Sequence, residues 1–146
     1  MRVRTGGCLC GAVRYHVDGP MRPVIACHCH QCRKQSGHYF AATQAARSNV
    51  EITGGDAITW YRASDNAERG FCSRCGSALF WNWDSADRLS ILAGSLDDPS
   101  GLELIGHIHT AEKGDYYPIT DRLPQREHGC DGDPVTDLTG SPEWPA

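Results

Sequence analysis

The sequence lacks the features that would place the protein in a membrane, in a secretory pathway or on a nucleic acid. No long apolar run occurs in its 146 residues, so we predict no membrane-spanning segment. The N-terminus carries neither the apolar stretch nor the small-residue cleavage site of a secretory signal. Its 14 lysines and arginines are outnumbered by 18 aspartates and glutamates, which argues against a broad nucleic-acid-binding surface. We therefore expect a cytoplasmic protein that binds neither membranes nor nucleic acid.

Also absent is any amphipathic helical pattern longer than about ten residues. Residues 11–17 instead alternate apolar and polar side chains, as a half-buried strand does, and the turn-forming tripeptide 18–20 follows. Residues 50–53 and 58–62 flank a glycine-rich turn and predict a hairpin. Comparable short segments lie at 24–26, 39–43, 78–81, 89–93 and 104–110. These patterns predict a small all-β fold built of hairpins.

Length and composition indicate one folded domain. A chain of 146 residues with 40% hydrophobic residues has the size and composition of a single globular domain. After Gly129 the sequence is rich in Gly, Pro and Asp and has little periodicity. We predict one domain over residues 1–128 and a loosely ordered tail over residues 129–146.

Eight cysteines are the most informative feature that is present. Disulfides rarely persist in the cytosol, where clustered cysteines more often bind a metal or take part in redox chemistry. Since we expect a reducing compartment, metal binding is the leading interpretation.

Three of the cysteines form one local cluster. Cys27, Cys29 and Cys32 occur within six residues, and two cations follow at once. Three thiolates are one short of a closed tetrahedral zinc site, so a site built here would leave a position open for water or substrate. If this segment is extended, His28 and His30 point away from the side that Cys27 and Cys29 share. We therefore predict that the two histidines are neighbours of the metal and not its ligands.

Four other cysteines form two pairs. Cys8 and Cys10 project to one side of an extended segment, and Cys72 and Cys75 have the spacing of a zinc knuckle, where Gly76 supplies the positive φ that such a turn needs. The two pairs together could form a closed four-thiolate site that stabilises the fold. The seven cysteines then divide most economically into four and three.

The sequence leaves another division open. Cys8 and Cys10 could instead join Cys29 and Cys32, which would leave Cys27 beside the knuckle pair. Spacing specifies pairs better than it specifies which pairs share a metal. Cys130, isolated near the predicted tail, is interpreted as a free cysteine.

The cluster of three also has alternative interpretations. A remote histidine such as His38 or His107 could close it into a structural site. Its Cys-x-x-Cys spacing could serve redox chemistry, although such motifs belong near a βαβ pattern that this sequence does not show.

Several sequence blocks resemble one known family. They lie at 6–15, 27–37 and 71–77, followed by 94–99, 107–109 and 121–125. Together they resemble the glutathione-dependent formaldehyde-activating enzyme family, and the resemblance extends from about Thr5 to Gln125. One segment, 113–118, departs from the family pattern because it lacks the usual Pro-Trp pair.

The resemblance implies a fold, a metal content and an activity. The fold is a β-tent of short antiparallel strands organised around two zinc ions, and the activity is that of a carbon-sulfur lyase. The partners would be a small glutathione-like thiol and an aldehyde, which form or release an S-(hydroxymethyl)glutathione-like adduct. The implied catalytic zinc ligands are Cys27, Cys29 and Cys32, and the structural ones are Cys8, Cys10, Cys72 and Cys75.

Residues after the cluster are candidates for substrate binding. Arg33 and Lys34 could offset the thiolate charge and attract the carboxylates of the substrate. Ser36 and Gly37 could shape a loop whose backbone donors face the substrate. A nearby histidine, at 28, 30 or 38, could move the proton between thiol and hydroxyl.

Two other functions fit the same residues. The protein could be a lyase that acts on a different small thiol. It could also be a non-catalytic zinc module that binds a protein partner, for which Tyr116 and Tyr117 would offer contact surface.

Overall fold

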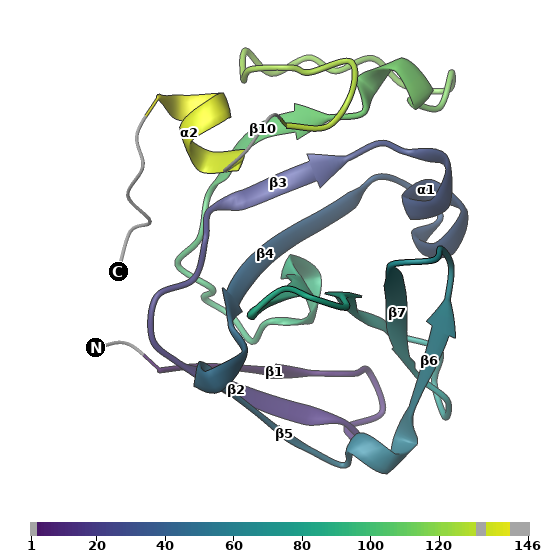
Figure 1. Ribbon diagram of the computed structural model, residues 1–146, viewed down its shortest axis with the longest axis vertical. Coiled ribbons are helices and arrows are strands. Elements are labelled where there is room, and N and C mark those ends of the chain that lie inside the picture. Colours follow the sequence, from purple (N-terminus) through teal and green to yellow (C-terminus); the bar gives the residue numbers. More distant parts are fainter. Residues whose placement is uncertain (1–2, 131–133, 141–146) are drawn as a thin grey trace.

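A computed structural model describes residues 3–130 and 134–140, and it contains two β-sheets (Figure 1). The smaller sheet has three antiparallel strands in the order β1-β2-β5. Its strands are β1 (Val3–Gly7), β2 (Arg14–Asp18) and β5 (Val50–Thr53). In β1 and β2 buried and exposed side chains alternate, so each of these strands has one buried face.

The larger sheet has seven strands in the order β10-β3-β4-β9-β8-β7-β6. All neighbouring pairs are antiparallel except β10 and β3, which run parallel. In Figure 1 the smaller sheet lies at the bottom, with β3 and β4 rising on one side and β6 and β7 on the other. The strands are β3 (Val24–Cys27), β4 (Phe40–Ala46), β6 (Ile58–Arg62), β7 (Ala67–Cys72), β8 (Ala78–Trp83), β9 (Arg88–Leu92) and β10 (Leu104–Ile108).

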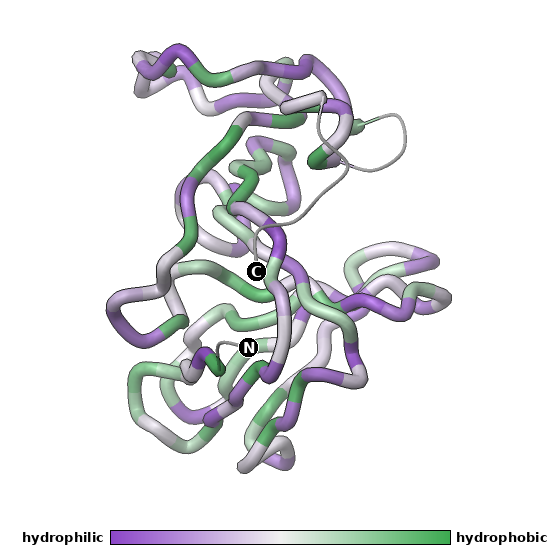
Figure 2. The backbone as a smooth tube through the Cα atoms, turned by 90° about the vertical axis from the view of Figure 1, so that its left-hand side faces the viewer, coloured by the Kyte–Doolittle hydropathy of each residue, from purple (hydrophilic) through white to green (hydrophobic). Residues whose placement is uncertain are grey.

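Helices in the described residues are short. The α-helices are α1 (His30–Ser36) and α2 (Pro134–Thr139), and the 3₁₀ turns are η1 (Arg47–Asn49), η2 (Gly55–Ala57), η3 (Ala93–Ser95) and η4 (Thr110–Glu112). None of the helices in residues 3–130 and 134–140 is long and apolar enough to cross a membrane. Figure 2 shows hydrophobic and hydrophilic residues interchanging along the coloured part of the tube. The predicted all-β class is confirmed.

The predicted hairpin between residues 50–53 and 58–62 is wrong. Both segments are strands, but β5 pairs with β2 in the smaller sheet and β6 pairs with β7 in the larger one. Gly54 has φ 72° and approaches the Ala12 carbonyl so closely that a Cβ would lie 1.8 Å from its oxygen. The turn at Gly54 and η2 therefore carry the chain from one sheet to the other.

The segment predicted to be a loosely ordered tail contains α2. Val135 and Leu138 of this helix are buried, and the Leu138 methyl groups lie over Gly106 of β10. The spacing of these two apolar residues places them on one face of a helix. Residues 131–133 and 141–146 of the predicted tail lie outside the described residues.

The main core lies between the two sheets. Its fully buried members include Val17 from the smaller sheet, Val13 from the loop before β2, and Leu79, Phe80 and Ile91 from the larger sheet. Inward residues of both sheets fill the space, as in other two-layer β-folds.

Tyr15 ties the two layers together. Its hydroxyl hydrogen-bonds the Ser95 hydroxyl over 2.6 Å, and its ring meets Phe80 edge to face at 5.5 Å between centroids. Gly6 lies directly against this ring, where a Cβ would come within 2.4 Å of the tyrosine oxygen. One side chain of β2 thus contacts β1, β8 and η3.

We predict that Tyr15→Phe lowers the free energy of unfolding by about 0.5–1.5 kcal/mol, because the ring still packs and the Ser95 hydroxyl still donates to the Leu92 carbonyl, but the hydrogen bond between Tyr15 and Ser95 is lost. Urea unfolding followed by circular dichroism measures this change. Tyr61→Phe, at an exposed ring of β6, is the matched control and should change little. Equal effects of the two substitutions would contradict a specific link between the layers.

Candidate metal centre

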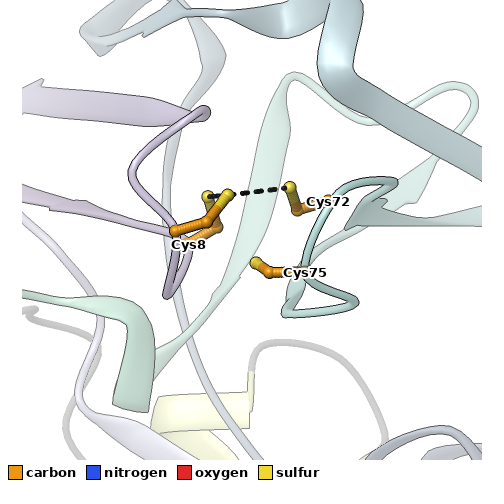
Figure 3. A group of neighbouring side chains, drawn as sticks. Cys8, Cys72 and Cys75 are labelled. Carbon is orange, nitrogen blue, oxygen red and sulfur yellow. Dashed lines mark hydrogen bonds between the residues drawn. The ribbon is translucent and has the colours of Figure 1, made fainter.

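Four cysteine sulfur atoms from two loops meet at the end of the core. Cys8 and Cys10 lie in the loop between β1 and β2, Cys72 ends β7, and Cys75 lies in the turn between β7 and β8. All four sulfur atoms lie within 4.8 Å of one another. Figure 3 shows the Cys8 side chain pointing toward those of Cys72 and Cys75 from the facing loop. The Cys10 and Cys72 sulfur atoms are 3.8 Å apart.

Each loop is shaped to present its sulfur atoms. Gly11 and Gly76 have φ values of 82° and 79°, a conformation in which a side chain would be strained. The Val13 amide donates to the Cys8 sulfur over 3.2 Å, and the Arg74 amide donates to the Cys72 sulfur over 3.4 Å. Backbone donors aimed at sulfur stabilise the thiolate form of a cysteine.

The spacing of these sulfur atoms fits a tetrahedral metal ion. Zinc–sulfur bonds of about 2.3 Å in a tetrahedron place sulfur atoms about 3.8 Å apart. The Cys8–Cys10 and Cys10–Cys72 distances are 3.6 and 3.8 Å. The donor set is therefore one that zinc accepts, and it joins the smaller sheet to the larger one.

The second sulfur group gathers at the junction of β3 and α1. Cys27 ends β3, Cys29 is the N-cap of α1, and Cys32 lies in its first turn. Their sulfur atoms lie within 4.8 Å of one another, and the Cys32 amide donates to the Cys29 sulfur over 3.3 Å. The cap geometry, with Cys29 extended and Cys32 helical, is what brings the three thiols together.

Close approach makes the three thiols share their protons unequally. The hydrogen bond between the Cys27 and Cys29 thiols raises the pKa of Cys27 and lowers the pKa of Cys29. Three thiolates at this distance repel one another unless a cation lies between them. A divalent cation is the natural counter-charge for such a group.

No histidine or carboxylate joins the group of three within the part of the chain that the structure describes. His107 instead contacts His28 and Asp121. His38 hydrogen-bonds the Tyr116 hydroxyl over 2.5 Å. Neither of the two histidines that could have closed the group is therefore available to it.

The group of three faces a cavity of about 510 Å³, a size typical of small-molecule sites. Strand register brings three of its lining residues side by side. Arg69, Trp81 and Ser90 are cross-strand partners on β7, β8 and β9. No aspartate or glutamate is found among the described lining residues. Its lining combines sulfur, cationic and aromatic side chains: Cys27, Cys29, Cys32, Arg22, Arg69, Arg88, Phe40, Trp81 and Trp83.

Behind the cluster, His28 belongs to a buried chain of hydrogen bonds. Its Nδ1 contacts the Tyr117 hydroxyl, its Nε2 lies 2.9 Å from His107 Nδ1, and His107 Nε2 lies 2.9 Å from an Asp121 oxygen. Burial and the neighbouring His107 lower the pKa of His28 to about 4. The Asp121 carboxylate can only accept, so with both rings neutral each bond in the chain donates toward it. These hydrogen bonds fix the position of the His28 ring, and His28 lies between Cys27 and Cys29 in the sequence.

Comparison with known proteins assigns the chain to a family. A family model described as "Glutathione-dependent formaldehyde-activating enzyme" matches residues 3–112. The chain belongs to this family. It is 32% identical over 133 residues to a Halomonas elongata protein named "Putative glutathione-dependent formaldehyde-activating enzyme", and the match covers 83% of each chain.

Two further relatives are more distant. An uncharacterised lyase of Schizosaccharomyces pombe is 29% identical over 76 residues, which is 52% of this chain and 55% of the relative. A Rhodobacter sphaeroides protein of known crystal structure has a TM-score of 0.53 and 24% identity, covering 68% of this chain and 98% of its own. The Rhodobacter structure supports the fold alone.

In this family member, the four residues predicted to bind substrate do not line the described cavity. Arg33 donates from Nε to the Glu112 carbonyl over 3.0 Å, and Lys34 lies on the exposed side of α1. The Ser36 hydroxyl donates back to the Cys32 carbonyl over 2.8 Å. Gly37 ends α1 with φ 83°. All four belong to the end of the helix, and their contact with substrate stays a prediction.

The histidines predicted to move a proton, at positions 28, 30 and 38, are not among the described residues that line the cavity. His28 is buried behind the cluster and His30 is exposed at the start of α1. Among the described lining residues the histidine is His109, whose φ of 55° is unusual for a side chain other than glycine. No periodic pattern in the sequence marks His109, because its position depends on the strand β10 that precedes it.

Segment 113–118, which lacks the Pro-Trp pair of the family, does not line the cavity but contacts His28 through Tyr117. Lys113 lies over the Tyr117 ring at 4.6 Å and donates to the Gly114 carbonyl over 2.8 Å. Tyr117 in turn contacts His28. Tyr117 thus packs against His28, whereas Tyr116 is exposed and contacts His38.

We predict that His107→Phe lowers the free energy of unfolding by about 1–3 kcal/mol, because it leaves a buried His28 nitrogen without its partner. Urea unfolding of the metal-loaded protein measures the change. His128→Phe, at an exposed position, is the control and should change little.

The dependence of stability on pH provides a second test of the hydrogen bonds from His28 through His107 to Asp121. The hydrogen bond from His107 lowers the pKa of Asp121, so the stability that this carboxylate contributes is present above about pH 4 and is lost as pH falls below that value. Asp121→Asn should therefore lose less stability than the unaltered protein over this acid range. An identical pH profile for both proteins would contradict the account.

Proposed function

We propose that the protein is a zinc-dependent carbon-sulfur lyase that forms or cleaves an S-(hydroxymethyl)glutathione-like adduct of a small thiol and an aldehyde. Family membership and the names of the relatives, which include an enzyme and a lyase, support a lyase-type activity. The observation that carries the proposal is the group of three cysteines, which faces a ligand-sized cavity and has no fourth protein ligand among the described residues.

The two sulfur groups have different proposed roles. Cys8, Cys10, Cys72 and Cys75 would hold a structural zinc, because four thiolates complete its tetrahedral coordination. Cys27, Cys29 and Cys32 would hold a catalytic one. Bound by these three thiolates, zinc would offer a fourth position to a substrate thiol and lower the pKa of that thiol.

The reaction needs a thiolate, an aldehyde and one proton. The thiolate sulfur attacks the aldehyde carbon, a carbon-sulfur bond forms, and the carbonyl π-bond breaks. The proton released by the thiol ends on the aldehyde oxygen, which becomes the hydroxyl of the adduct. Cleavage runs through the same bonds in reverse.

The cavity supports binding of an anionic thiol. Phe40, Trp81 and Trp83 supply apolar walls that limit access of water to the reacting atoms. Arg22 and Arg88 bring positive charge to the same lining, which attracts the carboxylates of a glutathione-like molecule. His109, the lining histidine, is our candidate for moving the proton between thiol and hydroxyl.

Exchange-spectroscopy NMR of formaldehyde with glutathione tests the activity. We predict that zinc-loaded protein accelerates the exchange above the buffer rate and that Cys32→Ser abolishes the acceleration. Cys130→Ser is the matched control, because Cys130 lies outside both sulfur groups, and it should be fully active.

Other results have defined meanings. No acceleration by the intact protein with any of a panel of small thiols would reject the lyase and favour a zinc-stabilised binding module. Acceleration with another thiol but not with glutathione would retain the lyase and reject glutathione as its substrate.

A further inference from the structure

Arg69 is a buried cation in the wall of the cavity. It lies in the middle of β7, between Tyr61 of β6 and Trp81 of β8, and its exposed fraction is 4%. Arginine is rarely buried to this extent without a charged partner, because removing its charge from water is costly. Something in its surroundings must compensate for the charge.

The contacts of the guanidinium are polar but neutral, with one exception. Nη1 donates to the Gln35 amide oxygen over 3.2 Å, and Nη2 lies 3.5 Å from the Gln31 amide oxygen. The plane lies near the Phe40 ring, 5.2 Å from its centroid. The exception is the Cys32 sulfur, which Nη2 approaches to 3.4 Å.

Carboxylates are missing from this environment. No aspartate or glutamate forms an ion pair with Arg69 in residues 3–130 and 134–140, and its Nε–H has no hydrogen-bond partner there. Arg62, the residue that follows Tyr61 on β6, is by contrast paired with Asp84 at 2.9 Å and lies near Glu68. The negative charge nearest to Arg69 is therefore that of the thiolates, and Cys32 is the thiol it touches.

We propose that Arg69 is a positioning residue that balances the charge of the three-cysteine site. A zinc ion with three thiolates carries one net negative charge, and a substrate thiolate as fourth ligand adds a second. The buried guanidinium offsets one of these charges and fixes Cys32 through an N–H···S hydrogen bond. It thereby allows the open position to accept a thiolate, an inference that rests on the proposed function.

The charge of Arg69 also bears on the class of substrate. Since its guanidinium is held by α1 glutamines and by Cys32, it balances the sulfur cluster and is not the group that binds a substrate carboxylate. Arg69 should therefore favour thiolates in general, whether or not they carry a carboxylate. Selection among thiols is left to other lining residues.

Cobalt-loaded protein tests this role by spectroscopy, without measuring turnover. The bands that arise from charge transfer between sulfur and cobalt report on the electron density of the ligand sulfur atoms. We predict that Arg69→Gln shifts these bands to longer wavelength, because Cys32 loses a donor, and weakens binding of mercaptoethanol by about tenfold or more. Arg69→Lys, which keeps the charge, should recover most of the affinity. Arg62→Gln is the matched control and should change neither quantity.

Two titrations separate this proposal from the proposed function. The unaltered protein should bind both mercaptoethanol and mercaptoacetate, and failure to bind either would reject the open site while the band shift still decides the hydrogen bond to Cys32. Equal loss of affinity for both thiols in Arg69→Gln supports general charge balance. Unchanged bands and affinities in Arg69→Gln would overturn the proposal.

Misfolding of a variant is detected by the cobalt stoichiometry. If Arg69→Gln fails to bind as much cobalt as the unaltered protein, Arg69→Met supplies the comparison, because methionine fills similar space and has no N–H to donate to Cys32. A blue-shifted or unmoved band in Arg69→Met would then overturn the hydrogen bond to Cys32. A red-shifted band with weakened thiol binding would support the proposal.

Discussion

Repulsion between thiolates held a few ångströms apart is the constraint on which this fold depends. Seven thiols gather in two groups, and each group needs a cation to be stable in its ionised form. The group of four joins the β1–β2 loop of the smaller sheet to the β7–β8 turn of the larger one. We propose that a zinc ion there substitutes for part of the core that a domain of this size would otherwise need.

The two groups differ in what surrounds them. The Cys8 and Cys72 sulfur atoms accept hydrogen bonds from backbone amides, and the group fills all four positions of a tetrahedron. The group of three is flanked by a cavity on one side and by the His28 chain on the other. Arg69 supplies the buried positive charge nearest to it. The same metal chemistry could thus serve stability in one place and reactivity in the other.

Local patterns in the sequence predict which thiols lie together, but not which strands pair. The Cys-x-Cys and Cys-x-x-Cys spacings and the positive φ of Gly76 depend on a few neighbouring residues, and the structure brings the thiols into the same groups of four and three. The pattern around Gly54 is that of a local hairpin, but β5 pairs with β2, which is distant in sequence, and β6 pairs with β7. A sequence pattern cannot report which sheet a strand joins.

Residues placed by long-range register could not be found from the sequence. Arg69 and Trp81 come together because β7 pairs with β8, and His28 and His107 because β10 pairs with β3. A charged residue inside a strand that leads directly into Cys72 was the one available hint for Arg69. Arg33 and Lys34, predicted to bind substrate, are near the three cysteines in the sequence. They lie in the last turn of α1 and do not line the cavity.

X-ray absorption at the zinc edge tests the central claim most directly. One closed and one open site in the same chain should give an average of about 3.5 sulfur ligands per zinc, with a light oxygen ligand making up the remainder. Saturation with a small thiol should raise the average to about 4 as the open position takes a fourth sulfur. Four sulfur ligands per zinc before any thiol is added, or an imidazole ligand that the thiol does not displace, would contradict the account.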